Sequence, residues 1–273
     1  MLTKLQQHRV SKPWGRTDVP EGFGPSDGDP LGEIWFQRED ADDPLLIKYL
    51  FTSERLSVQV HPDDAAAQTA GLARGKDEAW IVLSARSNGE LGIGLRSPVS
   101  PGELRAAAMD GSIVDLVDWR RADAGDAYYS PAGTVHALGP GLTVLEIQQN
   151  SDVTYRLYDY GRPRELHLDK GIDAARSDLV IEKVREREID QLRSIAVAGP
   201  KFTVERWRSG AGTLDATDAE PAWLIPIKGT IAADGQALVA PDVWIAEGRA
   251  AVEVGPDSEL LVAYEGTRLR AVA

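Results

Sequence analysis

Short stretches in which hydrophobic and polar residues alternate recur along the first 160 residues, with glycine- and proline-containing turns between them. In the segment Leu56-Ser-Val-Gln-Val-His every second residue is hydrophobic, which is the period of a half-buried β-strand. The same criteria predict strands at 33–37, 45–50, 56–61, 78–83, 90–95, 127–130, 134–138, 142–148 and 154–158. Strands this short, joined by such turns, indicate a β-sandwich or barrel of the jelly-roll type.

Helical signals are few and local. Ser100-Pro-Gly-Glu combines a capping serine, a proline at the first helical position and a glutamate three residues on, and predicts a helix to about residue 109. A second helical piece is expected at 112–117, so that 95–123 forms a small helical insertion. The alanine-rich segment 63–73 is predicted to be a short helix capped by aspartate. Residues 12–43, rich in glycine, proline and aspartate, read as an irregular segment around the strand at 33–37.

Three parts are expected along the chain. Residues 1–160 form a β-barrel with its helical insertion at about 95–123, and residues 161–200, which are charged, form a linker with a helix. From residue 201 short strands and glycine turns return, so that 201–273 is predicted to be a second, smaller β-barrel.

The second β region partly repeats the first. Glu78-Ala-Trp-Ile aligns with Pro221-Ala-Trp-Leu, and the segment 125–133 aligns with 241–248 with a gap of one residue. In this alignment Pro221 replaces Glu78 and Ala251 replaces His136. All four histidines precede residue 201. The second barrel is therefore predicted to be a degenerate copy without a metal site.

Composition narrows the class of protein. The net charge of −13 argues against nucleic acid or an anionic membrane as partners, and it requires local positive charge wherever an anionic substrate binds. The chain has no cysteine, which excludes disulfides and thiolate metal sites. No apolar run reaches the length of a membrane span, and the first residues do not form a signal peptide. We expect a cytoplasmic protein, and nothing in the sequence indicates its oligomeric state.

Residues with metal-ligand chemistry lie at the ends of predicted strands in the first barrel. Gln59 and His61 point to the same face of one strand, roughly 6.5 to 7 Å apart, and Pro62 ends that strand. Glu78 and His136 lie at two other strand ends. Two histidines, one carboxylate and one neutral oxygen suit a divalent transition metal such as zinc. The alternative is structural: a polar strand face, a surface carboxylate at Glu78 and a turn cap at His136.

Several ordered segments resemble class I mannose-6-phosphate isomerase, a cupin-fold family, in its short bacterial form. The resemblance runs in register from about Lys12 to Ile172 and fades to a general barrel likeness after that. The segments that carry it are Leu46-Ile-Lys-Tyr-Leu, Leu56-Ser-Val-Gln-Val-His-Pro-Asp-Asp, Gly75-Lys-Asp-Glu-Ala-Trp, Ser130-Pro-Ala-Gly-Thr-Val-His-Ala-Leu, Leu145-Glu-Ile-Gln-Gln-Asn-Ser-Asp-Val-Thr-Tyr-Arg-Leu-Tyr-Asp-Tyr and Arg164-Glu-Leu-His-Leu-Asp-Lys.

The resemblance implies a mainly β, cupin-type jelly roll with one zinc ion, held by the four residues already singled out: Gln59, His61, Glu78 and His136. It further implies a catalytic and substrate-binding set within the same barrel. Arg156 and Lys76 would line the sugar site, and Glu146 is the acid/base candidate. Lys48 and Ser57 match positions associated with the substrate phosphate.

Each of these assignments has a structural alternative. Glu146 and Arg156, expected to project from neighbouring strands, can be a buried carboxylate and its guanidinium partner. Lys76 can be a solvated turn lysine. The resemblance also leaves open whether Arg162 or Arg164 supplies a basic residue that is common after this position in the family.

The function that the resemblance implies is metal-dependent interconversion of mannose-6-phosphate and fructose-6-phosphate through an enediolate. A non-catalytic cupin that binds a sugar phosphate as a sensor is the alternative from another class. A metal cupin oxygenase is a second enzymatic alternative, but such enzymes usually bind redox-active iron through three histidines or two histidines and a carboxylate. Gln59 and the set of lysines and arginines favour the isomerase.

Overall fold

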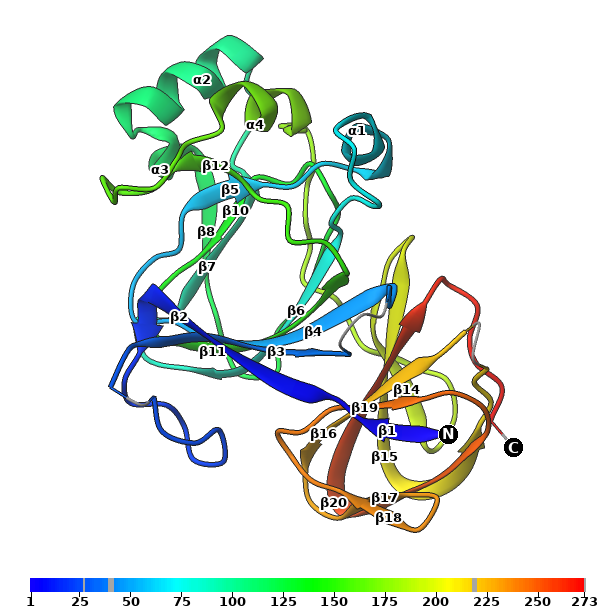
Figure 1. The fold of residues 1–273 in the computed structure, drawn as a ribbon. Coiled ribbons are helices and arrows are strands. Elements are labelled where there is room, and N and C mark those ends of the chain that lie inside the picture. Colours follow the sequence, from blue (N-terminus) through cyan, green and yellow to red (C-terminus); the bar gives the residue numbers. More distant parts are fainter. Residues whose placement is uncertain (27, 39–41, 218–219, 273) are drawn as a thin grey trace.

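The computed structural model describes residues 1–26, 28–38, 42–217 and 220–272. Within these residues the chain forms three antiparallel sheets and four helices (Figure 1). The mainly β architecture predicted from the alternating pattern is confirmed. No helix of the described part is long and apolar enough to cross a membrane.

Two sheets from the first 160 residues face each other and enclose the polar site described below (Figure 1). The five-stranded sheet has the order β12 (Tyr155–Tyr158), β5 (Val58–Val60), β10 (His136–Leu138), β7 (Glu90–Leu95) and β8 (Val117–Arg121). The six-stranded sheet has the order β2 (Gln6–Arg16), β3 (Leu31–Gln37), β4 (Leu45–Phe51), β11 (Leu142–Gln149), β6 (Glu78–Ala85) and β9 (Ala127–Ser130).

The central strands β4 and β11 of the six-stranded sheet are buried on both faces. Along β11, Leu145 and Ile147 pack in a hydrophobic core that also contains Phe202 and Trp223 from the C-terminal region. Glu146, between them in sequence, therefore points to the opposite face, into the space between the first two sheets. Strand alternation thus places a carboxylate inside the barrel, although every residue of β11 is buried.

The third sheet gathers the C-terminal strands. It contains β13 (Arg187–Glu188), β14 (Arg193–Ala198), β15 (Phe202–Leu214), β16 (Ala222–Lys228), β17 (Ile231–Ala233), β18 (Gln236–Leu238), β19 (Trp244–Ala246) and β20 (Ala250–Glu265). It also includes β1 (Leu2–Lys4), which pairs with β19. The sheet thus takes in residues on both sides of position 201, and the division into three parts remains a prediction.

The internal repeat is visible in the pairing of strands. In the first copy β6 pairs with β9, and in the second β16 pairs with β19, both antiparallel. Trp80 and Trp223, matched in the repeat, are both almost fully buried. The interior of the second copy is filled by hydrophobic side chains, among them Trp207, Leu224 and Trp244.

The helices lie beside the five-stranded sheet, at the top of the view in Figure 1. Helix α2 (Pro101–Asp110) begins with the predicted capping box, because the Ser100 and Glu103 side chains bond each other's backbone N–H groups. Helix α3 (Ile113–Leu116) follows it as expected. Helix α1 (Asp64–Thr69) is shorter than predicted, and α4 (Leu168–Ala174) provides the expected helix of the linker.

Three strands of the first 160 residues were missed in the sequence: β1, β2 and β8, of which β8 lies inside the expected helical insertion at 95–123. Residues 12–16, expected to be irregular, form the second half of β2, which runs along the edge of the six-stranded sheet. Its pairing with β3 is interrupted after Val10 and again after Ser11. Pro13 and Gly15, which weaken a strand assignment, are tolerated here because an edge strand needs fewer ladder bonds. Conversely, β5 covers only Val58–Val60 of the predicted 56–61.

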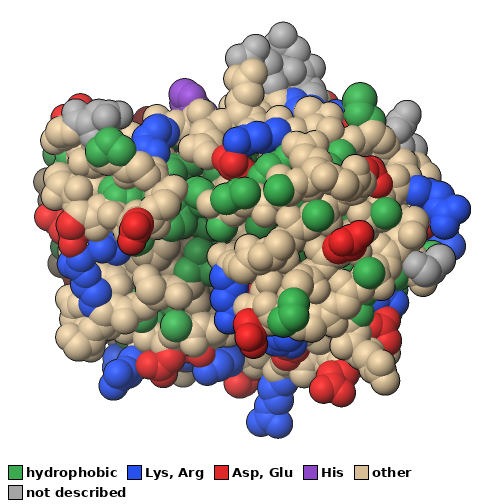
Figure 2. Space-filling view, turned by 90° about the horizontal axis from the view of Figure 1, so that it is seen from below, with side chains coloured by type: hydrophobic (Ala, Val, Ile, Leu, Met, Phe, Trp, Pro, Cys, Tyr) green, Lys and Arg blue, Asp and Glu red, His purple; other side chains and the backbone are tan. Residues whose placement is uncertain are grey.

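The face drawn in Figure 2 shows two lobes with hydrophobic side chains gathered in the hollow between them. Acidic and basic side chains are interspersed around this hollow, so the net charge of −13 does not form one acidic patch on this face. A groove where the two β regions meet has apolar lining residues that include Phe23, Tyr49 and Ile227.

Candidate active site

A cavity of about 410 Å³ lies between the five- and six-stranded sheets. Polar and charged side chains predominate in its lining. The residues that line it are Lys12, Trp14, Glu33, Lys48, Leu50, Leu56, Ser57, Gln59, Lys76, Glu78, Trp80, His136, Leu138, Glu146, Asp152, Thr154, Arg156, Arg164, Glu165 and His167. Eight of the nine residues predicted for the site are among them, and the ninth, His61, contacts Glu78.

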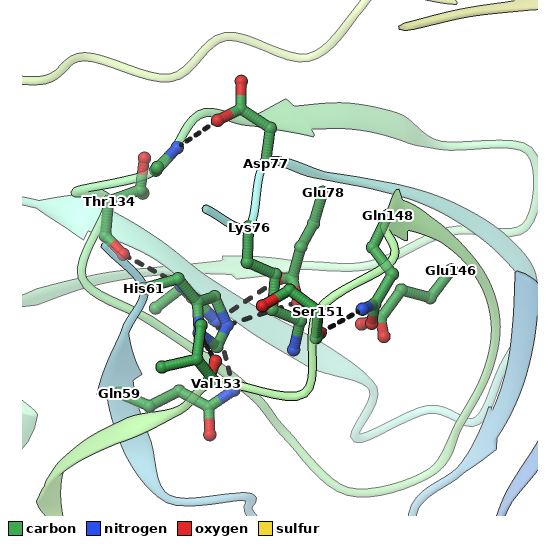
Figure 3. Close-up of polar contacts among 12 residues, drawn as sticks. Gln59, His61, Lys76, Asp77, Glu78, Thr134, Glu146, Gln148, Ser151 and Val153 are labelled. Carbon is green, nitrogen blue, oxygen red and sulfur yellow. Dashed lines mark hydrogen bonds and ion pairs between the residues drawn. The ribbon is translucent and has the colours of Figure 1, made fainter. Parts of the chain in front are cut away.

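Three of the predicted metal ligands converge at the wall of this cavity (Figure 3). His61 Nε2 lies 3.2 Å from Glu78 Oε1, and His136 Nε2 lies 3.5 Å from Glu78 Oε2. The ligand atoms of all three side chains lie within 4.8 Å of one another, and all three residues are buried. This spacing fits a single metal ion among them.

Hydrogen bonds to the other ring nitrogens orient both imidazoles. His61 Nδ1 lies 2.8 Å from the carbonyl oxygen of Val153, and His136 Nδ1 lies 2.9 Å from that of Thr134. A carbonyl accepts only from an N–H, so Nδ1 carries the proton in both rings. Each Nε2 then presents its lone pair toward Glu78. Such support of the distal nitrogen is characteristic of histidines that bind metals.

The charges at this cluster also suit a metal. Burial, reinforced by the nearby Lys76 ammonium, lowers the pKa of His61 to about 3, and burial lowers the pKa of His136 as well. Burial acts to raise the pKa of Glu78, but Lys76 and His61 outweigh it and hold that pKa well below its usual value. Two neutral imidazoles and one carboxylate are the ligand forms that zinc requires.

Unsatisfied polar atoms provide the structural test of this fit. His61 Nε2 and both carboxylate oxygens of Glu78 are buried and have no hydrogen-bond partner among the described residues. Lys76 Nζ lies 2.9 Å from Glu78 Oε1, but as an ion pair without hydrogen-bond geometry. Buried polar atoms without partners are costly unless something else binds them. The donor set therefore fits a divalent cation.

Gln59 lies next to this cluster through strand pairing. Gln59 on β5 is the direct pairing partner of His136 on β10, and its amide Nε2 lies 3.2 Å from His136 Nε2. The amide oxygen instead accepts a hydrogen bond from the Ser57 hydroxyl at 3.1 Å. A half-turn of the amide group exchanges these two positions and directs the oxygen toward the cluster. The assignment of Gln59 as a ligand thus remains a proposal, as does that of Ser57 as a substrate contact.

Three further charged residues extend inward from the cluster. Glu146 Oε1 lies 3.5 Å from Lys48 Nζ, and Glu146 Oε2 accepts a hydrogen bond of 3.1 Å from the indole of Trp80. Burial and the charge of Glu78 raise the pKa of Glu146 to about 7. Burial opposes the charged form of Lys76, but Glu78 and Glu146 prevail and raise its pKa. With a pKa near neutral pH, the Glu146 carboxyl group can both accept and return a proton, as general acid–base catalysis requires.

Arg156 lies on the opposite side of the cavity from Glu146. It is on β12, which belongs to the five-stranded sheet, whereas Glu146 is on β11 of the six-stranded sheet. The expectation that the two project from neighbouring strands was wrong, because the chain crosses between sheets in the intervening loop. Both still line one cavity. Arg156 Nη1 donates to the carbonyl of Glu165 at 3.3 Å and has no carboxylate partner among the described ion pairs.

The structure separates the two arginines that follow Tyr160. Arg164 lines the cavity, although its guanidinium also bonds both carboxylate oxygens of Asp159. Arg162 is directed elsewhere, to Asp159 and the carbonyl of Arg55, and it does not line the cavity. Arg164 is thus the better placed of the two.

Some lining residues were missed in the sequence. Lys12 and Trp14 come from β2, in the segment expected to be irregular, and Glu33 comes from β3. The alternation Lys12-Pro-Trp14 is the only local signal for the first two, and Pro13 obscured it. His167 lies in the charged linker, and nothing in the hydrophobic pattern identifies it as a residue that lines the cavity.

Mannose-6-phosphate isomerases are found both among similar sequences and among similar solved structures. The mannose-6-phosphate isomerase of Streptococcus mutans is 34% identical over 238 residues, which cover 78% of this chain and 73% of the relative. The crystal structure of the Bacillus subtilis mannose 6-phosphate isomerase superposes with a TM-score of 0.82 at 28% identity, covering 96% of this chain and 99% of that one. A zinc-bound mannose 6-phosphate isomerase shares the fold at 13% identity, with a TM-score of 0.71 over 97% of this chain and all of that one. No protein-family model matches the chain.

Proposed function

This chain belongs to the mannose-6-phosphate isomerase family, and we propose that it interconverts mannose-6-phosphate and fructose-6-phosphate with one bound zinc ion. The observation that carries this proposal is the buried group of His61, Glu78 and His136, at the wall of a cavity that also holds acid/base and cationic side chains. A zinc-bound structure of the same fold supports the choice of metal.

The reaction sets the chemical requirements. Converting an aldose to a ketose moves a proton between two adjacent carbons through an enediolate, so the site needs a group that accepts and returns a proton. It also needs positive charge beside the two oxygens, because they become more negative as the proton leaves. The two sheets on either side of the cavity strengthen both effects, because charges interact more strongly beside a protein wall than in bulk water.

His61, Glu78 and His136 would hold the metal, with Gln59 as a fourth ligand. A bound divalent metal supplies Lewis-acid stabilisation of the negative charge on the sugar oxygens. The chain's own contribution is to keep both imidazoles neutral and oriented through their Nδ1–H bonds, and to keep Glu78 ionised.

Glu146 is the proposed proton carrier. It is buried, its pKa is raised to about 7, and its carboxylate is fixed by the indole of Trp80 and by Lys48. Lys76, held between Glu78 and the cavity, adds positive charge near the same oxygens. This division of roles separates proton transfer from charge stabilisation.

Positive groups around the cavity meet the need set by a net charge of −13. Lys48 and Ser57 are the proposed contacts for the phosphate, and Arg156 for a sugar oxygen. A sensor that only binds sugar phosphate would require the cationic groups but not a buried carboxyl group with a pKa near 7. The similarity to a protein named mannose-6-phosphate isomerase also favours an enzyme over a sensor that only binds sugar phosphate.

Chelation tests the metal. We expect one zinc per chain, loss of isomerase activity after treatment with EDTA, and recovery on adding zinc. Metal content is measured by mass spectrometry, and activity by a coupled assay of fructose-6-phosphate formed from mannose-6-phosphate. EDTA already saturated with zinc is the control. Full turnover in metal-free protein would contradict the metal's role. A structure with a second metal ion inside residues 201–273 would contradict the prediction that this region binds none.

Replacing Arg156 by alanine tests its role. We expect a loss on the order of 100- to 1000-fold in kcat, a smaller change in KM, and unchanged metal content, because the guanidinium contacts charge that develops during the reaction. Arg162→Ala is the matched control. Its guanidinium is directed to Asp159 outside the cavity, so we expect a lower melting temperature with near-normal kcat. An Arg156→Ala enzyme that melts early but turns over normally would make Arg156 structural.

A further inference from the structure

Asp77 separates Lys76 from Glu78 in sequence and points the opposite way. Lys76 and Glu78 line the cavity, whereas the Asp77 side chain is directed to the outer side of the segment (Figure 3). The alternation of an extended chain explains this arrangement. Asp77 is nevertheless only 5% exposed, so its carboxylate is buried against another part of the protein.

The carboxylate of Asp77 binds two groups near His136. Its Oδ2 accepts a hydrogen bond of 2.6 Å from the Tyr129 hydroxyl, and its Oδ1 accepts one of 3.0 Å from the backbone N–H of Ala132. Ala132 lies in the loop between β9 and β10, four residues before His136. Asp77 therefore fixes the backbone preceding one metal ligand, Glu78, to the loop that precedes another.

A second set of bonds fixes the same segment from the side of His61. Asp64 Oδ1 accepts from the backbone N–H of Gly75 at 2.8 Å and from the amide of Gln149 at 3.0 Å. The Gln149 Oε1 in turn accepts from the backbone N–H of Asp77 at 3.0 Å. A Cβ atom on Gly75 would lie only 2.5–2.7 Å from the backbone of residues 62–64, so the two segments are in direct contact.

Both sets of bonds end on the C-terminal region. Lys201, between β14 and β15, donates to Asp64 Oδ2 at 2.6 Å. The Tyr129 ring packs against Phe202, with ring centroids 5.2 Å apart. A Cβ atom on Gly199 would lie 1.9 Å from the Tyr129 ring, so the backbone of the β14–β15 turn lies directly on this tyrosine.

We propose that the turn 199–202 of the C-terminal region positions the metal ligand Glu78, through Tyr129 and Asp77 on one side and through Lys201 and Asp64 on the other. The inference rests on the proposed function, because it assigns these groups to the support of its metal site. It also gives the C-terminal region a role: it holds Lys76 and Glu78, at the start of β6, at the cavity wall.

The first test removes one hydroxyl. Tyr129→Phe keeps the ring against Phe202 and deletes the bond to Asp77, together with a long one of 3.4 Å that the hydroxyl accepts from the backbone N–H of Lys201 in the same turn. Loss of a group that supports a metal ligand costs roughly 10- to 100-fold in metal affinity or activity. We therefore expect the zinc dissociation constant, measured by competition with a chromophoric chelator well below the melting temperature, to rise about 10-fold or more.

Tyr264→Phe is the matched control. Its hydroxyl donates to the buried carboxylate Glu205 at the same distance of 2.6 Å, but within the core of the C-terminal region. We expect it to lower the melting temperature without changing zinc affinity. Equal zinc affinities of wild type and Tyr129→Phe, or equal weakening by both variants, would overturn the inference.

A second pair of variants tests the bonds that run through Lys201 and Asp64. Lys201→Met removes the ion pair to Asp64, and Glu247→Gln removes a comparable ion pair to Arg38 that also joins the first β region to the C-terminal region. Zinc affinity should fall in the first variant and remain in the second; no difference between them would contradict the role of Lys201. Wild-type protein that binds no zinc would instead refute the proposed function itself.

Discussion

Replacing His136 by alanine should abolish zinc binding and isomerase activity together. His136 Nε2 faces Glu78 Oε2 at 3.5 Å, and its Nδ1–H is fixed by the carbonyl of Thr134, so no other described side chain can take over its position. Without it the proposed ligand set is reduced to His61, Glu78 and the neutral amide oxygen of Gln59, and Lys76 then competes as the ion-pair partner of Glu78. Zinc is bound mainly by histidine, cysteine and carboxylate side chains, so one imidazole and one carboxylate beside an amide hold it much more weakly.

The measurement is zinc per chain together with kcat in the coupled assay. His8→Ala is the matched control, because His8 is exposed on β2, with its ring beside that of Trp35 at a centroid distance of 6.3 Å. We expect that control to keep one zinc and normal turnover. A folded His136→Ala protein that retains zinc and turns over normally would show that the metal lies elsewhere.

The convergence of His61, Glu78 and His136 could be predicted in part because their positions follow local rules. His61 directly follows β5, before a proline that ends the strand, and Glu78 and His136 are the first residues of β6 and β10. Alternation alone placed Lys76 and Glu78 on one face. The comparison of the two copies added a hypothesis, because Pro221 and Ala251 align with Glu78 and His136. Ala251 is exposed on β20 and so does not lie in the hydrophobic interior of the C-terminal region.

Long-range pairing set the limit of that prediction. Lys12 and Trp14 reach the cavity because β2 pairs with β3 along an edge that tolerates Pro13, and no local pattern specifies this pairing. Arg156 and Glu146 were expected on neighbouring strands, but the loop between them crosses from one sheet to the other. The pairing of β1 with β19 joins residues more than 200 positions apart and likewise has no local signature.

Replacing Glu146 by glutamine should reduce kcat by about 100- to 10,000-fold while zinc content and KM change little, because general acid–base groups contribute factors of this size. The amide has nearly the same shape, and its oxygen can still accept the indole N–H of Trp80. It cannot carry a proton between two carbons. Exchange of the substrate's C2 proton with solvent, followed by nuclear magnetic resonance in deuterium oxide, should be lost in parallel with kcat.

Glu33 is the competing carboxylate, and it makes this prediction specific. It lines the same cavity and is bound in a similar manner, accepting the indole N–H of Trp35 at 2.6 Å with Lys12 Nζ 3.5 Å away. Burial and the charge of Glu78 raise the pKa of Glu146 to about 7. Proton exchange should therefore depend more strongly on Glu146 than on Glu33. If Glu33→Gln abolishes exchange while Glu146→Gln retains it, Glu33 is the proton carrier, and the ion pair of Glu146 with Lys48 is structural.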